Sequence, residues 1–250
     1  MSAGTAAIAE ELDAAVARLD AAALAARYWA QDEFLVIPEL LPPAAVTALL
    51  DDVRRLEPSL NRNYIPRHKK GGSVSAFAIA EDGPALLAFY RSERFRRFLS
   101  GLVRAPLLCC PDEDPHACAL YFYTEAGDHM GYHYDTSYYK GARYTVLLGL
   151  VQDSASRLRC RLHTRQPGRA PVDLEVATEP GAMVIFNGDK VYHGVSPSRP
   201  GDRRIVFTME YVTDPTMGRL PRLFSNLKDA FAYFGVGTLW RGRRGARAAS

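Results

Sequence analysis

Cysteine is scarce in this chain: there are four in 250 residues, and none of them forms a Cys-X-X-Cys pair. A chain of this length can bury a sizeable core without cross-links, so a disulfide scaffold is not indicated. The scarcity therefore excludes the class of small, disulfide-rich secreted proteins. We expect a soluble protein with reduced thiols in the cytoplasm.

Long apolar runs are also missing. No run approaches the roughly 20 residues that a membrane-spanning helix needs, and the first ten residues lack the basic stretch and apolar run of a signal peptide. The net charge of +3 is too small to indicate a nucleic-acid or membrane partner. The chain ends in a basic cluster that we expect to be a solvated tail, with a nucleic-acid arm as the alternative. Its members are Arg241, Arg243, Arg244 and Arg247.

What the sequence does contain is the composition of a globular protein. Hydrophobic residues make up 48% and charged residues 24%, which are ordinary globular values. Apolar residues at near-helical spacing predict amphipathic helices over residues 6–30, about 42–57 and about 84–102. A short apolar run at 34–37 predicts a strand.

The residue composition of the sequence changes near Ala117, from helical periodicity to short strand-like runs. Short runs rich in Val, Tyr, Phe and Thr alternate there with Gly, Pro and Asp, which is typical of a β-sandwich or barrel. The predicted strands are 119–124, 144–151, 159–163, 172–176, 183–186 and 203–212. A short helix is predicted around 223–234.

We expect a single domain over residues 1–250, because no Pro/Gly linker is long enough to separate two domains. In this division residues 1–116 form a mainly helical support region and residues 117–213 form the β core. Residues 214–250 hold the C-terminal helix and the basic tail.

The most informative motif is Gly131-Tyr-His133-Tyr-Asp135. Side chains alternate in an extended segment, so His133 and Asp135 point the same way and can share a metal ion. His193 follows 58 residues later, after a Pro-Gly turn, an apolar strand and an Asn-Gly-Asp turn. Two histidines and one carboxylate bind one face of Fe(II) and leave three positions open.

The open positions suit a chelating 2-oxo acid and O2. The far carboxylate of the oxo acid needs a fixed pair of donors, which arginine provides. Arg203 lies ten residues after His193 and begins another predicted strand. Arg204 is its neighbour, and alternation is expected to turn it to the opposite face.

These residues resemble the pattern of the Fe(II)/2-oxoglutarate-dependent oxygenases. The likeness covers about residues 117–213 and extends to the Pro-Gly-Ala that precedes the hairpin and the His-Gly-Val-Ser-Pro that follows it. It implies a mainly β fold with helices: a double-stranded β-helix (a cupin-like jelly roll), with N-terminal helices packed against one sheet.

The resemblance also implies the site. His133, Asp135 and His193 would bind Fe(II), and Arg203 would hold the distal carboxylate of 2-oxoglutarate, with O2 as the second co-substrate. The candidates for a further hydroxyl contact to that carboxylate are Tyr121, Tyr123 and Thr145.

The segment from His133 to Leu150 resembles a smaller bacterial subgroup of free-amino-acid hydroxylases and halogenases. Halogenases of that subgroup lack the carboxylate ligand, because chloride occupies its place on iron. This chain keeps Asp135. The resemblance therefore implies hydroxylation or a related oxidation of a small molecule, such as a free amino acid or a natural-product precursor, with release of succinate and CO2.

Two alternatives remain open at this point. A hydroxylase of peptidyl side chains, of the prolyl-hydroxylase type, would use the same three ligands. A metal-binding jelly roll without catalysis would use them as a structural or sensing site. A zinc-protease pair of His129 and His133 is disfavoured, because the glutamate that follows the first histidine in those enzymes is absent.

Candidates for substrate contact fall in two segments. A basic turn over residues 67–72 is either a solvated loop or a cationic cover for an anionic substrate. Near the metal ligands, several tyrosines are either substrate contacts or ordinary sheet packing. The candidate residues are Arg67, His68, Lys70, His129, Thr136, Tyr138 and Tyr139.

Overall fold

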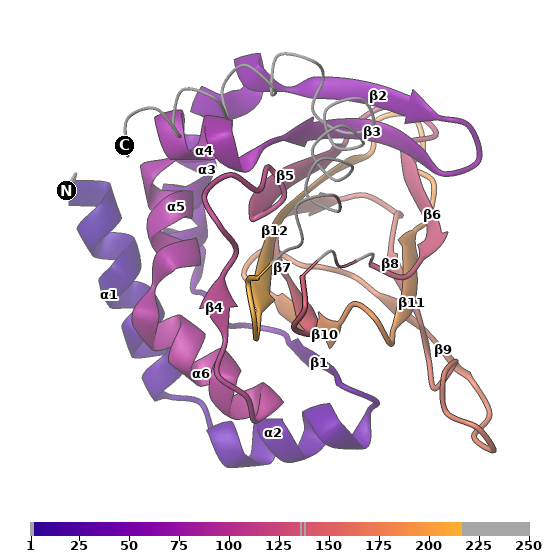
Figure 1. Cartoon of the computed structure of the whole chain (residues 1–250). Coiled ribbons are helices and arrows are strands. Elements are labelled where there is room, and N and C mark those ends of the chain that lie inside the picture. The colour runs from indigo at the N-terminus through magenta and orange to yellow at the C-terminus, as the bar shows by residue number, and fades with distance from the viewer. Residues whose placement is uncertain (1–2, 136, 138, 217–250) are drawn as a thin grey trace.

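A computed structural model describes residues 3–135, 137 and 139–216 (Figure 1). None of its described helices is both long and apolar enough to cross a membrane. The predicted C-terminal helix at 223–234 and the basic tail lie outside the described residues. The helices are α1 (Ala3–Ala17), α2 (Ala21–Ala30), α3 (Pro43–Leu56), α4 (Ala76–Asp82), α5 (Pro84–Arg91) and α6 (Glu93–Val103), with a 3-10 turn at Glu57–Ser59.

Two predicted helices are each divided in the structure. The helix predicted over 6–30 is interrupted at Asp20, whose side chain accepts a hydrogen bond from the backbone N–H of Ala23 (3.0 Å). The helix predicted over 84–102 is interrupted at Ser92, whose hydroxyl caps α6 through the N–H of Phe95 (3.2 Å). In both cases a short polar side chain starts a new helix instead of continuing the old one.

The strands follow the predicted pattern in the second half of the chain. Each of the six strands predicted there is found with bounds that differ by no more than two residues. The strands are β1 (Phe34–Ile37), β2 (Asn61–Ile65), β3 (Lys69–Val74), β4 (Leu108–Cys109), β5 (Cys118–Tyr123), β6 (His129–His133), β7 (Arg143–Asp153), β8 (Leu158–Leu162), β9 (Val172–Val176), β10 (Met183–Asn187), β11 (Tyr192–Val195) and β12 (Arg203–Val212).

The expected basic turn at 67–72 is only partly a turn. From Lys69 onward the chain is strand β3, which forms a hairpin with β2. Asn, Lys and Gly are poor strand formers, so local preference did not indicate this hairpin. Its pairing is imposed by the neighbours of β3, namely β5 and β6.

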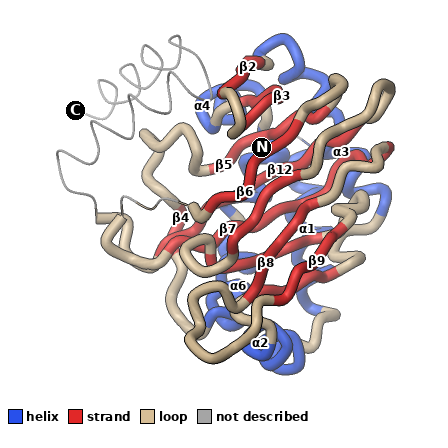
Figure 2. Tube along the Cα trace, turned by 90° about the vertical axis from the view of Figure 1, so that its right-hand side faces the viewer, coloured by secondary structure: helices blue, strands red, loops and turns tan. Residues whose placement is uncertain are grey.

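The sheet curls into the jelly roll that the resemblance implied. Its strand order is β1-β10-β7-β12-β5-β3-β6-β11-β8-β9, and the described pairs are antiparallel. Strands β1, β10, β7, β12 and β5 form a larger wall covered by the helices, and β6, β11, β8 and β9 form the facing wall (Figures 1 and 2). Strand β3 joins the two walls.

Alternation along β12 separates the core from the interior of the roll. Ile205, Phe207, Met209 and Tyr211 are buried in the core beneath the helices. The residues between them face the cavity between the two walls: Arg204, Val206, Thr208 and Glu210. The same strand therefore contributes to stability on one face and to the site on the other.

We expect Phe207→Ala to destabilise the fold by about 3–5 kcal/mol, the usual cost of deleting a buried phenyl ring. Phe207 is fully buried and packs edge-on against Phe89 of α5, with ring centroids 6.4 Å apart. Denaturant unfolding followed by circular dichroism measures the loss. Val172→Ala, at a side chain with 44% exposure, is the matched control and should stay within about 0.5 kcal/mol of the parent. Equal effects of the two substitutions would contradict this packing.

Candidate functional site

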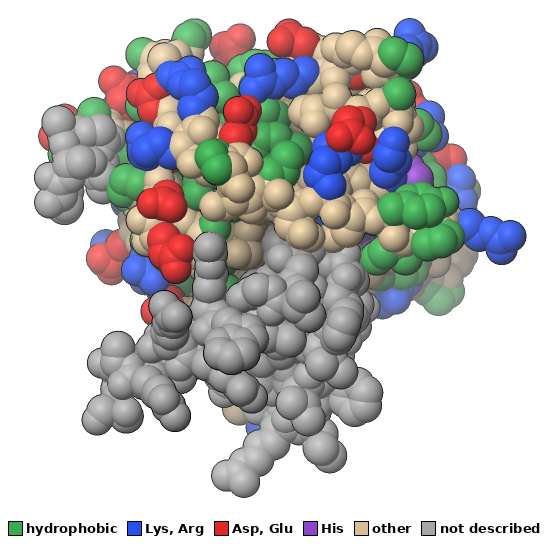
Figure 3. Space-filling view, turned by 90° about the horizontal axis from the view of Figure 1, so that it is seen from above, with side chains coloured by type: hydrophobic (Ala, Val, Ile, Leu, Met, Phe, Trp, Pro, Cys, Tyr) green, Lys and Arg blue, Asp and Glu red, His purple; other side chains and the backbone are tan. Residues whose placement is uncertain are grey.

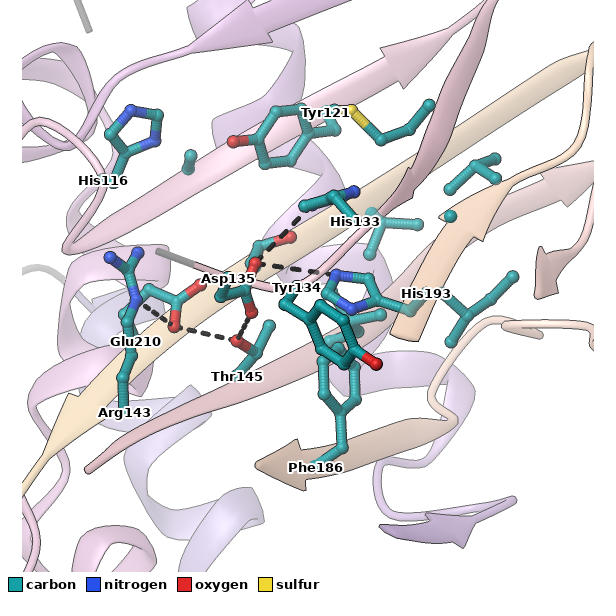
Figure 4. Close-up of a pocket in the computed structure, with 18 of the residues that line it drawn as sticks. His116, Tyr121, His133, Tyr134, Asp135, Arg143, Thr145, Phe186, His193 and Glu210 are labelled. Carbon is teal, nitrogen blue, oxygen red and sulfur yellow. Dashed lines mark hydrogen bonds and ion pairs between the residues drawn. The ribbon is translucent and has the colours of Figure 1, made fainter. Parts of the chain in front are cut away.

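A cavity of about 220 Å³ lies between the two walls of the roll. Its lining comes mainly from β5, β6, β7, β11 and β12 (Figure 4). Side chains able to bind a metal gather at one place in it, and a buried arginine also lines it.

The three predicted metal ligands meet in this cavity. His193 of β11 is the register partner of His133 of β6, and the centroids of the two imidazole rings are 4.4 Å apart. Asp135 follows β6 by two residues. Its Oδ1 lies 3.6 Å from the Nε2 of each histidine, and one donor atom from each residue lies within 4.8 Å of the others.

Backbone carbonyls set the orientation of both imidazoles. A carbonyl oxygen can only accept, so Nδ1 of His133 donates to the oxygen of Gly131 (2.9 Å). Nδ1 of His193 likewise donates to the oxygen of Val191 (3.1 Å). These bonds leave the Nε2 lone pair of each ring available to a metal and fix the ring plane.

The ionisation states of Asp135 and His193 also suit the binding of a divalent cation. Burial alone would raise the pKa of Asp135, but His193, His133 and Arg143 outweigh it and hold this pKa well below its usual range. Burial lowers the pKa of His193 to about 4, against the opposing effect of Asp135. An ionised Asp135 and a neutral His193 are in the protonation states that metal binding requires. Two nitrogens and one oxygen on one side of a cavity fit Fe(II).

Two contacts hold Asp135 itself. Its Oδ2 accepts a hydrogen bond from the hydroxyl of Thr145 (2.6 Å), and its backbone N–H donates to the oxygen of Gly188 (3.0 Å). The side chain is thus fixed with Oδ1 toward the histidines. Thr145 was expected beside the distal carboxylate of 2-oxoglutarate, and the structure instead places it against Asp135.

Two described arginines line the cavity, Arg143 and Arg204, and Arg204 is the more buried of them. It is 1% exposed, and one terminal nitrogen donates to the hydroxyl of Thr178 (3.0 Å). Its guanidinium lies 5.0 Å from the ring centroid of Tyr123. Its Nε has no hydrogen-bond partner within the described part of the chain. A buried positive charge in the lining of a cavity favours binding of an anionic group there, because a buried charge without a partner is costly.

The prediction that Arg203 faces the cavity is wrong. Its side chain is about half exposed and donates to the carboxylate of Glu57 (3.1 Å) on the outside of the sheet. The reason lies in the pattern of β12, where the large apolar side chains at odd positions pack against the helices. Arg204 shares the other face, which also carries Thr208 and Glu210.

Among the other predicted contacts, four line the cavity: Tyr121, Tyr123, His68 and Tyr139. The ring of His68, at the tip of the β2–β3 hairpin, lies edge-on to that of His133 with centroids 5.6 Å apart. The structure does not bring the remaining described candidates into the cavity lining: Arg67, Lys70 and His129. Thr136 and Tyr138 lie outside the described residues.

Of the two interpretations of the basic turn, the described side chains favour the solvated loop. Arg67 is exposed, and Lys70 donates to the backbone oxygen of Ala126 (2.7 Å). Arg62 of the same hairpin pairs with the buried carboxylate of Asp128 (2.7 Å). On the face seen from above, Lys and Arg side chains are interspersed with Asp and Glu side chains (Figure 3). Of the predicted basic turn, His68 is the member that reaches the cavity.

A charged cluster near the metal ligands, formed by Arg143, Glu210 and Asp114, was not predicted from the sequence. Arg143 donates from Nε to Glu210 (3.0 Å), and the hydroxyl of Tyr139 donates to Asp114 (2.7 Å). Burial, against the effect of Arg143, raises the pKa of Glu210 to about 7. A glutamate inside an otherwise apolar strand was the available signal, since Glu210 falls on the same face as Arg204.

We expect Gly188→Ala to weaken metal binding by about 10–100-fold, the usual effect of disturbing a residue that supports a ligand. A Cβ at Gly188 would lie 2.3 Å from Oδ2 of Asp135, so the carboxylate must move. Calorimetric titration of the metal-free protein with Co(II) measures the affinity. Gly101→Ala is the control, because its Cβ would meet no atom within 4 Å. Unchanged affinity in Gly188→Ala would contradict the placement of Asp135.

Comparison with known proteins identifies the family. The model of the Halogenase D family (HalD) matches residues 17–141, which is half of the chain. A search of the curated proteins finds no match.

Solved structures share the fold. The non-haem, α-ketoglutarate-dependent epimerase SnoN of nogalamycin biosynthesis is 16% identical, with a TM-score of 0.63 over 77% of this chain and 80% of that one. A prolyl hydroxylase from Trichoplax adhaerens, in complex with a peptide of hypoxia inducible factor, is 15% identical, with a TM-score of 0.62 over 82% and 92%. EvdO2 from Micromonospora carbonacea var. aurantiaca, complexed with 2-oxoglutarate, is 13% identical, with a TM-score of 0.57 over 79% and 92%.

At these identities the likeness to solved structures concerns the fold, and it confirms the jelly roll expected from the sequence. The chain belongs to the Halogenase D family and has the fold of the Fe(II)/2-oxoglutarate-dependent oxygenases.

Proposed function

We propose that this protein is an Fe(II)- and 2-oxoglutarate-dependent oxygenase that oxidises a C–H bond of a small molecule. The observation that carries the proposal is one cavity that holds both the His133, Asp135 and His193 donors and the buried guanidinium of Arg204. When bound, iron supplies the coupling of O2 reduction to the decarboxylation of 2-oxoglutarate, which yields succinate and CO2. The protein supplies binding, orientation and a site shielded from water.

In this proposal Arg204 binds the distal carboxylate of 2-oxoglutarate, the role expected from the sequence for Arg203. Its burial and its place in the lining of the cavity support the assignment. Thr178 fixes the guanidinium by accepting one hydrogen bond, and the ring of Tyr123 lies beside it. Because this arginine is already held in place, little side-chain entropy is lost when the carboxylate binds.

The retained carboxylate favours one of two outcomes, hydroxylation over halogenation. The family takes its name from halogenases, and the resemblance described above implies that halogenases lack a carboxylate ligand, since the halide takes its place. In this chain Asp135 fills that position and is held by Thr145 and Gly188. We therefore assign hydroxylation or a related oxidation.

The lining favours a small polar substrate that carries both signs of charge, such as a free amino acid or a related natural-product precursor. Arg143, Asp114 and Glu210 line one end of the cavity. Arg143 and Glu210 pair with each other, and a ligand with both a carboxylate and an ammonium group would extend this charged network. A polar ligand suits this charged and largely buried end of the cavity better than an apolar one. The volume of about 220 Å³ suits a small molecule more than a length of peptide.

A screen tests this function directly. The protein with Fe(II), 2-oxoglutarate and a panel of free amino acids should release succinate and yield a product heavier by one oxygen atom, and His193→Ala should release none. Peptides that contain proline form the second arm. Turnover with those peptides alone would replace the amino acid with a peptidyl substrate. No succinate from any arm would contradict the enzymatic proposal.

We expect Arg204→Ala to raise the KM for 2-oxoglutarate by about 10–100-fold, as expected for one lost charge-assisted contact. Arg203→Ala is the matched control, because it removes the neighbouring guanidinium from the outer face of the same strand. Steady-state succinate formation measures both variants. A larger effect from Arg203→Ala would contradict the assignment.

A further inference from the structure

The turn between β10 and β11, residues 187–191, touches two of the three proposed iron ligands. The oxygen of Gly188 accepts the backbone N–H of Asp135 (3.0 Å), and the oxygen of Val191 accepts Nδ1–H of His193 (3.1 Å). The Cα of Gly188 also lies against the Asp135 side chain, with no room for a Cβ. A shift of this turn would therefore displace a carboxylate and an imidazole together.

Glu33, which precedes β1, anchors this turn. Its Oε2 accepts a hydrogen bond from the side-chain amide of Asn187 (2.8 Å), and its backbone oxygen accepts the N–H of Asn187 (3.1 Å). Its Oε1 pairs with Lys190. Asn187 in turn accepts the N–H of Asp189 on its side-chain oxygen (3.1 Å). Glu33 and Asn187 are each 4% exposed, so water cannot readily replace these contacts.

The backbone at this point is strained. Asp32 and Glu33 both have a φ of +59°, a left-handed conformation that side-chain-bearing residues rarely adopt. The conformation turns both carboxylates inward. Asp32 accepts the N–H of His163 (2.6 Å), while Glu33 binds the turn at 187–191. Strain of this kind persists only where the surrounding contacts maintain it.

From this geometry we propose that Glu33 is a positioning residue for the iron site, acting through Asn187 and the 187–191 turn on Asp135 and His193. The inference rests on the proposed function, since it requires that these two residues bind iron. The Glu33 carboxylate holds Asn187, Asn187 holds the turn, and the turn presents one carbonyl to each ligand residue. The contact joins residues 154 positions apart.

The test uses Co(II) as a spectroscopic substitute for Fe(II) in the full-length, metal-free protein. Glu33→Gly removes the carboxylate and still permits the left-handed backbone, so it separates the side chain from the strain. We expect its Co(II) affinity to fall by about 10–100-fold and its visible d–d absorption to change. Glu33→Gln keeps an acceptor for the Asn187 amide and should retain the parent affinity and spectrum.

Two further variants serve as controls. Asp32→Gly removes the adjacent carboxylate, which has the same φ and is similarly buried at 6% exposure, but its partners lie outside the turn. Lys190→Ala removes only the ion pair of Glu33 with a half-exposed lysine. Both should keep the parent spectrum. An equal change in Asp32→Gly would overturn the proposal, because the effect would then belong to the strained corner in general.

The proposal would also be overturned if Glu33→Gly folds and has the same Co(II) affinity and absorption spectrum as the parent protein. If Glu33→Gly does not fold, Asn187→Ala decides the question, because it breaks the same link and leaves Glu33 in place; a parent spectrum there overturns the proposal. If the parent protein binds no Co(II), or if His193→Ala binds it equally well, the metal site itself is wrong and the inference fails with it. If the parent protein binds Co(II) through His193 and Glu33→Gly binds it with the same affinity and spectrum, only the inference about Glu33 fails.

Discussion

The register of β6 against β11 is the constraint on which the rest of the site depends. It sets His133 opposite His193, and Asp135 then reaches both rings from the end of the same segment. A slip of one residue would turn one imidazole to the outer face of the wall. Gly194 helps to fix the register, because a Cβ there would lie 2.7 Å from the backbone oxygen of Met130. The pairing also shifts between His193 and Val195.

A second constraint acts on the larger wall, which is formed by β1, β10, β7, β12 and β5. Its strands must pack against the helical layer on one face and present polar groups to the cavity on the other. Strand alternation satisfies both, so that Phe207 and Tyr211 lie in the core while Thr208 and Glu210 lie in the cavity. The stability of the helical layer and the geometry of the site are therefore linked through the same backbone.

Much of this arrangement could be predicted from local patterns. The strands from residue 118 onward are short runs rich in β-branched and aromatic residues, separated by turn residues. The pattern of His133, Asp135 and His193 indicated where the metal-binding atoms meet. The breaks at Asp20 and Ser92 were legible as capping residues. The sequence also indicates which side chains of β12 face the core, since its large apolar residues fall at odd positions. This alternation leaves Arg204 on the cavity face.

Other parts could not be predicted, because they depend on contacts between distant residues. The β2–β3 hairpin is built from weak strand formers and is stabilised by β5 and β6. The roles of Glu33 and Asn187 arise from a contact across 154 positions and from a backbone conformation that glutamate does not favour. Arg143 and Glu210 likewise come together only when β7 pairs with β12.

The pairing of β1 with β10 has a consequence for how the molecule assembles. Phe34 lies opposite Phe186, so this apolar strand gains its described sheet partner only after most of the chain has been synthesised. Contacts so remote in sequence slow folding, and an unpaired apolar strand on a growing chain is prone to aggregate. His193 lies later still in the chain, so the metal site cannot be complete before this segment has been synthesised and has paired with β6.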